Sequence, residues 1–282
     1  MPADVLYLSR EGVFPIVRDA DGRPLPTATG LPCSGTIQGE GKLCGVPSLF
    51  IRLQGCNLRC LWQSGGAVSP CDTAHASFHA GGRPCSVAEV LSLVDHNIGR
   101  LRHVVITGGE PLLQAPALLT LCRALKQRGL HLTLETNGTL YDDALCRLID
   151  LLSISPKLSS SDPTPAKAAA AGVPFAPAAA RHAALRVNID AIARLVGCAR
   201  ECSHDVQLKF VVATAADADE IRHTYIDRLP QLPPADVLVM PLGTDPATMH
   251  GAAMAAVGMA TAHGWRYSPR LHVDLFGNRE GV

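Results

Sequence analysis

The sequence has no net charge, since 25 Lys and Arg residues balance 25 Asp and Glu residues. Proteins that bind nucleic acid non-specifically carry a surplus of basic residues, so we expect no such binding. No run of about 18 apolar residues occurs, so no membrane span is predicted. The opening stretch, MPADVLYLSREGVFPIVRD, lacks a basic segment followed by an apolar one, so no signal peptide is expected. Together these absences favour a cytoplasmic protein that binds neither nucleic acid nor membrane.

Internal repeats are absent too, and the overall composition is that of a globular protein. Apolar residues make up 47% of the chain and charged residues 18%, which leaves enough apolar material for a sizeable core. Ten cysteines without an export signal argue for reduced thiols and against a disulfide framework. Most of them need only a place in the core, because free cysteine is often buried. We treat residues 1–282 as a single domain.

Six short β-rich runs alternate with helical patterns along the chain. The runs end in polar or turn-forming residues and read SLFIRLQG, HVVITGG, LTLETNG, LLSISPK, VQLKFVVA and DVLVMPLG. Between them, SVAEVLSLVDHNIG opens with a capping box of Ser86 and Glu89, and APALLTLCRALKQRG closes at Gly129. Two later helices are expected, in TAADADEIRHTYIDRL and DPATMHGAAMAAVGMATAHG. The alternation predicts an α/β fold with a mostly parallel sheet, as in a full or partial (β/α) barrel.

Two segments do not follow this alternation. Residues 1–34 form an N-terminal lead rich in Pro, Gly and Asp, and residues 159–184 form a Pro/Ala-rich insertion after the SPK strand end. We expect irregular structure in both, with no separate domain in either.

The predicted strand ends carry the polar, Gly-rich and Cys-rich groups of the sequence. They read QGCNLRC, TGGEP, ETNGT, SPK, LKFVV and MPLG. Because the carboxyl ends of barrel strands gather at one face, these groups are expected to face one another there. That convergence favours an enzyme.

Three cysteines, Cys56, Cys60 and Cys71, lie close together among polar residues just after an apolar strand. Thiolates bind soft metals and iron–sulfur clusters. A zinc site would need a fourth ligand, for which His75 and Cys85 are candidates. A cluster held by three cysteines would leave one iron open. By contrast, VGCARECSH looks like two core cysteines on one helical face.

The segments GCNLRCLW and CDT together resemble the cluster loop of radical S-adenosylmethionine enzymes, and TGGEP resembles their methionine-binding strand end. More specifically, the chain resembles the 7-carboxy-7-deazaguanine synthase family. The shared motifs, in the family's order, are GTIQGEG, FIRLQGCNLRC, CDT, VVITGGEPLLQ, LETNGT, ISPKLS, LKFVV and the tail RYSPRLHVDLFGNREGV. The resemblance implies a partial or modified TIM-type (β/α) barrel of the radical S-adenosylmethionine type.

The resemblance also implies the cofactors. Cys56, Cys60 and Cys71 match the ligands of a [4Fe–4S] cluster whose open iron binds S-adenosylmethionine, and one electron then cleaves that cofactor to a 5′-deoxyadenosyl radical. The residues that match the family's S-adenosylmethionine contacts are Gly109, Glu110, Ser155, Pro156, Lys157, Met240, Pro241, Leu242 and Gly243. An electron donor such as flavodoxin or ferredoxin and a homodimer are expected from the family as well.

The implied reaction is the ring contraction of 6-carboxy-5,6,7,8-tetrahydropterin to 7-carboxy-7-deazaguanine with loss of ammonia, a step toward deazapurines such as queuosine. Substrate contacts map to Ile37, Gln38, Gly39, Arg52 and Thr107. Arg52 lies in an apolar strand, where a buried guanidinium needs an anion such as a carboxylate. Thr73 matches a Mg²⁺ ligand, Asp72 is a candidate to accept a hydrogen bond from the groups around that ion, and His272 is a candidate to approach the substrate.

The third cysteine departs from the common family spacing, because QSGGAVSP is inserted at residues 63–70. We expect this stretch to bulge away as a loop while its ends stay close.

Two alternatives for the function stay open: another radical S-adenosylmethionine enzyme such as a glycyl-radical activase, and a non-enzymatic zinc or iron–sulfur protein. The residues specify neither the reductant nor the fate of the product.

Overall fold

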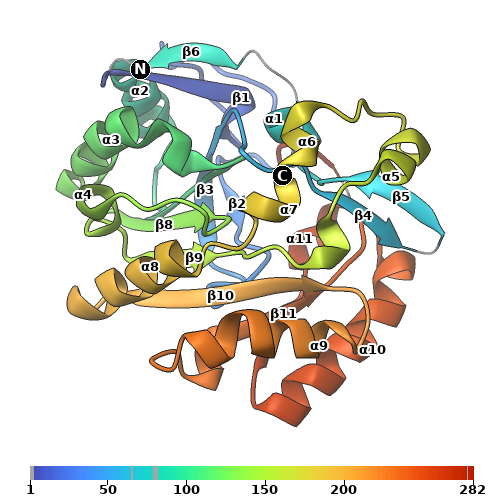
Figure 1. The fold of residues 1–282 in the computed structure, drawn as a ribbon. Helices are drawn as coiled ribbons and strands as arrows, with labels where there is room; N and C mark the ends of the chain where they lie inside the picture. Colours follow the sequence, from blue (N-terminus) through green and yellow to red (C-terminus); the bar gives the residue numbers. More distant parts are fainter. Residues whose placement is uncertain (1–2, 65, 79–81, 278) are drawn as a thin grey trace.

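The computed structural model describes residues 3–64, 66–78, 82–277 and 279–282 (Figure 1). Its centre is a sheet in which seven strands run parallel in chain order. They are β3 (Pro47–Leu53), β7 (His103–Gly108), β8 (His131–Thr136), β9 (Leu151–Ile154), β10 (Asp205–Val212), β11 (Val237–Pro241) and β12 (Arg266–Tyr267). The six predicted strands are thereby confirmed. The described sheet does not close on itself, so the fold is a partial barrel of the expected type.

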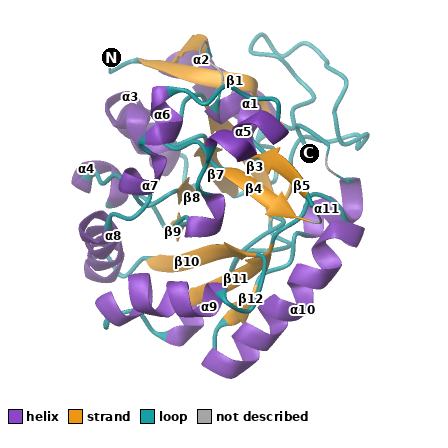
Figure 2. Cartoon of the chain, turned by 45° about the vertical axis from the view of Figure 1, so that its right-hand side comes forward, coloured by secondary structure: helices purple, strands orange, loops and turns teal. Residues whose placement is uncertain are grey.

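Helices form the outer layer around this sheet. α2 (Val87–Asn97), α3 (Ala115–Gln127), α4 (Asp143–Cys146) and α8 (Ile189–Glu201) follow one another along one side, and α10 (Pro246–His263) covers β11 (Figures 1 and 2).

The predicted helix signals work as expected. The Ser86 hydroxyl accepts a 3.1 Å hydrogen bond from the backbone N–H of Glu89, which caps the start of α2. Gly129 follows the last turn of α3 with a φ of 68°, the left-handed conformation in which glycine ends helices.

The prediction of irregular structure for residues 1–34 is wrong for β1 (Val5–Phe14). This strand pairs antiparallel with β3 on one side and with β6 (Arg83–Ser86) on the other. Leu6 and Leu8 are fully buried in the main core, and their burial fixes the strand although the rest of the N-terminal lead is rich in Pro and Gly. A short strand, β2 (Thr36–Ile37), also pairs antiparallel with β3.

The Pro/Ala-rich insertion is partly helical, so the prediction of irregular structure is wrong there too. It contains the 3₁₀ turn η2 (Ser159–Ser161), α5 (Pro165–Ala170), α6 (Pro177–Ala180) and α7 (His182–Leu185). Proline stands at the first position of α5 and α6, where its fixed φ favours a helix start, and alanine is the strongest helix former. The insertion forms no separate core.

The remaining elements are short. The segment expected as one helix after β10 divides into α9 (Asp217–Glu220), a π-helical turn η3 (Ile221–Tyr225) and a 3₁₀ turn η4 (Ile226–Arg228). Others are η1 (Pro111–Gln114), η5 (Pro234–Asp236), α1 (Ala74–Ser77) and α11 (Leu271–Phe276).

In the part of the chain that the structure describes, no helix combines the length and the apolar character that crossing a membrane requires.

The inserted stretch before Cys71 folds as a hairpin. β4 (Leu61–Ser64) and β5 (Ala67–Pro70) pair antiparallel and stand apart from the main sheet, at the right of Figure 1. The expected loop is therefore a two-stranded ribbon. The expected closeness of its ends is confirmed, because the backbone N–H of Cys71 donates a 3.2 Å hydrogen bond to the carbonyl of Cys60.

Candidate active site

One cavity opens where the carboxyl ends of the parallel strands meet. Its volume of about 220 Å³ is many times the ~10–15 Å³ that one water molecule needs, so it can hold organic ligands. Thirteen of the predicted site residues line it: Ile37, Gln38, Gly39, Arg52, Cys56, Cys60, Cys71, Thr73, Thr107, Gly109, Ser155, Lys157 and Met240. The predicted convergence of strand ends is thereby confirmed.

The three cysteines gather at one wall of this cavity. They pack with four apolar side chains, Leu58, Trp62, Val211 and Leu242. Burial raises the pKa of the Cys56 thiol to about 11 and also raises the pKa values of Cys60 and Cys71. Three thiols in so apolar a wall become thiolates only when a metal compensates their charge.

The residues between the first two cysteines hold the loop in shape. The Arg59 guanidinium donates to the carbonyls of Cys56 and Leu58 at 2.6 and 2.7 Å. The Asn57 amide donates to the Thr139 hydroxyl at 2.7 Å. The backbone N–H of Arg59 donates to Nδ1 of His182 at 3.0 Å. The fully buried His182 comes from the Pro/Ala-rich insertion, so that insertion supports the cysteine loop, which sequence reasoning missed.

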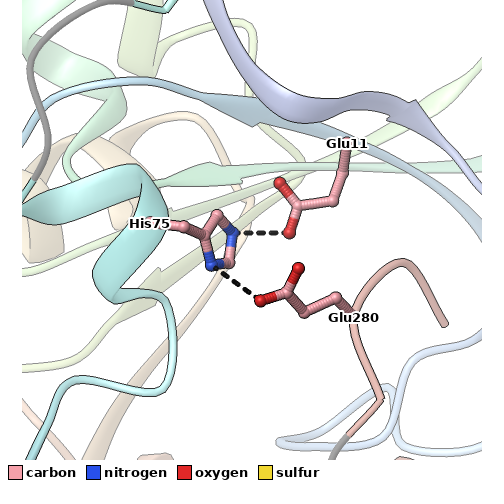
Figure 3. Close-up of side chains that lie close together, drawn as sticks. All are labelled: Glu11, His75 and Glu280. Atoms are coloured by element: carbon pink, nitrogen blue, oxygen red, sulfur yellow. Dashed lines mark ion pairs between the residues drawn. The ribbon is translucent and has the colours of Figure 1, made fainter.

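The chemistry of this donor set fits an iron–sulfur cluster with one iron left open. Three thiols share the wall, whereas the two sequence candidates for a fourth ligand are engaged elsewhere. His75 lies 2.5 Å from Glu11 and 3.6 Å from Glu280 (Figure 3), and Cys85 is buried in β6. Neither lines the cavity.

Gly109 lets two chain segments approach closely at the cavity edge. A Cβ at this position would lie 2.3 Å from the carbonyl oxygen of Gly55 and 2.8 Å from the Cβ of Cys56, so no other residue fits without movement. The neighbouring Glu110 is fully buried and does not line the cavity.

The Glu110 carboxylate is already occupied by this chain. It accepts hydrogen bonds from the backbone N–H groups of Leu112 and Asn137 and from the Thr136 hydroxyl, at 3.1, 2.7 and 2.8 Å. Burial nonetheless raises the pKa of Glu110. Glu110 therefore joins the end of β7 to the end of β8.

The SPK turn presents Lys157 to the cavity. The Lys157 ammonium donates to the Ser155 hydroxyl at 2.9 Å, while the Lys157 carbonyl accepts from Arg186 and Tyr225 at 3.0 and 2.8 Å. Of the residues predicted to contact S-adenosylmethionine, Pro156, Pro241, Leu242 and Gly243 do not line the cavity. Leu242 packs against the cysteine wall instead.

The Arg52 side chain lies between an anion and an aromatic ring that sequence reasoning missed. Its Nε atom is 3.6 Å from Oε1 of Glu11, and its guanidinium lies 5.0 Å from the centre of the Phe14 ring. Both partners come from β1. Arg52, Phe14 and Phe50 line the cavity, so this wall offers one cation beside two aromatic rings.

Four further charged side chains line the cavity without having been predicted as its contacts. They are Glu40, Glu135, Lys209 and Arg270. Burial alone would raise the pKa of Glu40, but the charges of Lys209 and Arg270 hold it well below its usual range. Asp72 and His272, the two further candidates from the sequence, line the cavity as well.

Comparison with known proteins agrees with this geometry. The Radical SAM superfamily model matches residues 50–197. A 7-carboxy-7-deazaguanine synthase of Halobacterium salinarum is 39% identical over 249 residues, covering 86% of this chain and 88% of that protein. One of Rhodopirellula baltica is 36% identical, covering 87% of this chain and 85% of that protein.

A solved structure supports the fold. The crystal structure of QueE from Escherichia coli superposes with a TM-score of 0.54 at 22% identity, covering 92% of this chain and 95% of that one. With two relatives above 30% identity over most of their length, the chain belongs to the 7-carboxy-7-deazaguanine synthase family of the Radical SAM superfamily.

Proposed function

We propose that this chain is a radical S-adenosylmethionine carbon–nitrogen lyase that converts 6-carboxy-5,6,7,8-tetrahydropterin to 7-carboxy-7-deazaguanine and ammonia. One observation carries the proposal: residues matching the family's cluster, cofactor and substrate motifs come from separate strand ends and line a single cavity. When bound, the [4Fe–4S] cluster and S-adenosylmethionine supply a 5′-deoxyadenosyl radical that abstracts a hydrogen atom from the substrate.

The chain's own task is to hold and insulate these groups. Cys56, Cys60 and Cys71 would hold the cluster, and the buried packing around them limits access of water. Gly109 would bring a backbone edge close to the cofactor, with Lys157 and Met240 on other walls of the same cavity. Glu110 would act indirectly by fixing Asn137, whose amide lies 3.8 Å from the Cys56 sulfur.

The substrate would lie against the opposite wall. Arg52 would pair with its carboxylate, while Phe14 and Phe50 would face its rings. Gln38 and Thr107 offer hydrogen-bonding groups along the pterin edge.

Mg²⁺ is proposed at Thr73, because this residue lines the cavity and its hydroxyl does not cap the helix that follows it. The hydroxyl is held 3.2 Å from the Cys71 sulfur. Three further proposals rest on the family resemblance: a homodimer, flavodoxin or ferredoxin as the electron donor, and a cytoplasmic location.

The test compares two pterins. Anaerobically reconstituted protein should cleave S-adenosylmethionine and consume the 6-carboxylated tetrahydropterin, but leave the analogue without the carboxylate largely unchanged. Cofactor cleavage with both pterins untouched would favour an activase instead. Protein that takes up zinc but no iron and sulfide would favour the non-enzymatic alternative.

A further inference from the structure

Arg270 contacts three chain segments that each border the cavity. It lies between β12 and α11, and only 8% of its surface is exposed. Its Nε donates to Oε1 of Glu40 at 3.2 Å, and its Nη2 donates to Oδ2 of Asp72 at 2.6 Å. Its Nη1 donates to the carbonyl of Gly243. Every nitrogen of the guanidinium therefore has a partner.

The three partners belong to three different parts of the proposed site. Glu40 follows the substrate segment 37–39, Asp72 stands between Cys71 and Thr73, and Gly243 ends the segment 240–243. The planar fork of an arginine serves the three acceptors from three separate nitrogens, whereas a lysine would have to reach all of them from a single nitrogen.

The two carboxylates depend on Arg270 to different degrees. Glu40 also pairs with the Lys209 ammonium, so it keeps one cation without Arg270. Asp72 pairs with Arg270 alone among the ion pairs of the described residues. Losing the guanidinium would therefore leave Asp72 without a counter-charge, and the loop that carries Asp72 would lose its link to the substrate segment.

We propose that Arg270 is a positioning residue that fixes the loop of Cys71 and Thr73 relative to the substrate segment 37–39. The inference rests on the proposed function, because it takes these residues as cluster, magnesium and substrate contacts. With the link intact, cofactor cleavage and substrate conversion stay coupled. Without it, the cluster is still bound by its three cysteines, but the substrate is misaligned.

The first experiment measures this coupling. Arg270→Gln should bind as much iron as the wild type, but its kcat should fall at least tenfold. The ratio of 5′-deoxyadenosine to 7-carboxy-7-deazaguanine should rise at least threefold, and Arg270→Lys should give an intermediate ratio. The control is Arg128→Gln, which removes a cation paired with Asp95 at 2.7 and 2.8 Å on the outer helices and should stay within twofold of wild type. An unchanged kcat and ratio in Arg270→Gln would overturn the proposal.

A second measurement is independent of turnover. In cluster-loaded protein, hydrogen exchange of the backbone amides of residues 72–78 should be at least threefold faster in Arg270→Gln than in the wild type. Asp72→Ala should show the same increase, and the double variant no further one, because both changes remove the contact between Arg270 and Asp72. Asp72 is half-exposed, so its variant serves if Arg270→Gln does not fold.

Each outcome of the exchange measurement decides the inference separately from the proposed function. Wild-type exchange rates in Asp72→Ala would overturn the inference even if the enzyme converts carboxypterin. Faster exchange in both variants would support the link even if the substrate proved to be a different one.

Discussion

The backbone N–H of Cys71 donates a hydrogen bond to the carbonyl of Cys60, although the hairpin of residues 61–70 separates them. The two strands of the hairpin run out and back in register, from Leu61 opposite Pro70 to Ser64 opposite Ala67. The insertion therefore delivers Cys71 to the position beside Cys60 that a short connection would also reach.

A deletion of residues 63–70 should consequently leave the site intact. Closing the shorter loop changes the free energy of unfolding by only about 1–2 kcal/mol, because loop entropy varies slowly with length. The iron content after anaerobic reconstitution should stay within about 20% of the wild type. A variant that folds, by circular dichroism, but binds no iron would show that the hairpin itself shapes the cysteine wall.

Cys71→Ala should lose most of its cluster and its ability to cleave S-adenosylmethionine. Three of the four irons each need a cysteine ligand, and the variant keeps only two of the three thiols. Iron and sulfide analysis together with 5′-deoxyadenosine formation measures this. The matched control is Cys202→Ala, a half-buried cysteine at the end of α8 that lies outside the cavity. A full and active cluster in Cys71→Ala would refute the ligand assignment.

Glu11→Gln should raise the KM for the carboxylated pterin about fivefold, with little change in kcat. The Glu11 carboxylate contacts His75 (Figure 3) and also lies 3.6 Å from Nε of Arg52. The ion pair with Arg52 stabilises the orientation of the guanidinium by about 1 kcal/mol. Steady-state kinetics checks the prediction. A lower KM would show instead that Glu11 competes with the substrate for Arg52.

The control for that variant is Glu89→Gln, which removes the partner of Arg83 in an ion pair of 2.6 Å. Neither Glu89 nor Arg83 lines the cavity, so both kinetic constants should stay at wild-type values.

The buried His103 should make the folded state less stable in mild acid. Its ring contacts the Ser48 and Thr133 hydroxyls at 2.5 and 2.7 Å, and burial lowers its pKa from 6.5 to about 4. The unfolded chain therefore takes up a proton as the pH falls below 6.5, while the folded chain does so only near pH 4. The stability from this histidine is present above pH 6.5 and declines as the pH falls toward 4.

Denaturant unfolding at pH 7.5 and pH 5 measures this effect. The wild type should lose about 2 kcal/mol more between the two values than His103→Asn does. His182, whose burial also lowers its pKa to about 4, adds a loss that both proteins share. Equal pH dependence in wild type and variant would mean that folding does not lower the pKa of His103.

Much of the fold could be predicted because its signals are local. Each parallel strand is an apolar run that ends in polar residues, so its limits and its functional end can be found together in the sequence. β1 was missed because its pairing with β3 and β6 is fixed by contacts distant in the chain, and because it leads into a Pro-rich segment.

In the site, too, the features with local sequence signals could be predicted and those that depend on contacts between distant residues could not. The motif residues reach the cavity as expected, but Glu110 does not face it, since Thr136 and Asn137 satisfy its carboxylate. Arg270 is more than 190 residues from Asp72 and Glu40 in the sequence, so no local pattern could reveal the link. Charge networks of this kind become visible only when the chain is folded.

The most direct test of the central claim is a product measurement on the anaerobically reconstituted, reduced wild-type protein with S-adenosylmethionine, Mg²⁺ and 6-carboxy-5,6,7,8-tetrahydropterin. We expect mass spectrometry to detect 7-carboxy-7-deazaguanine together with 5′-deoxyadenosine, and Cys71→Ala to yield neither. Formation of 5′-deoxyadenosine while the carboxypterin is recovered unchanged would contradict the proposed function.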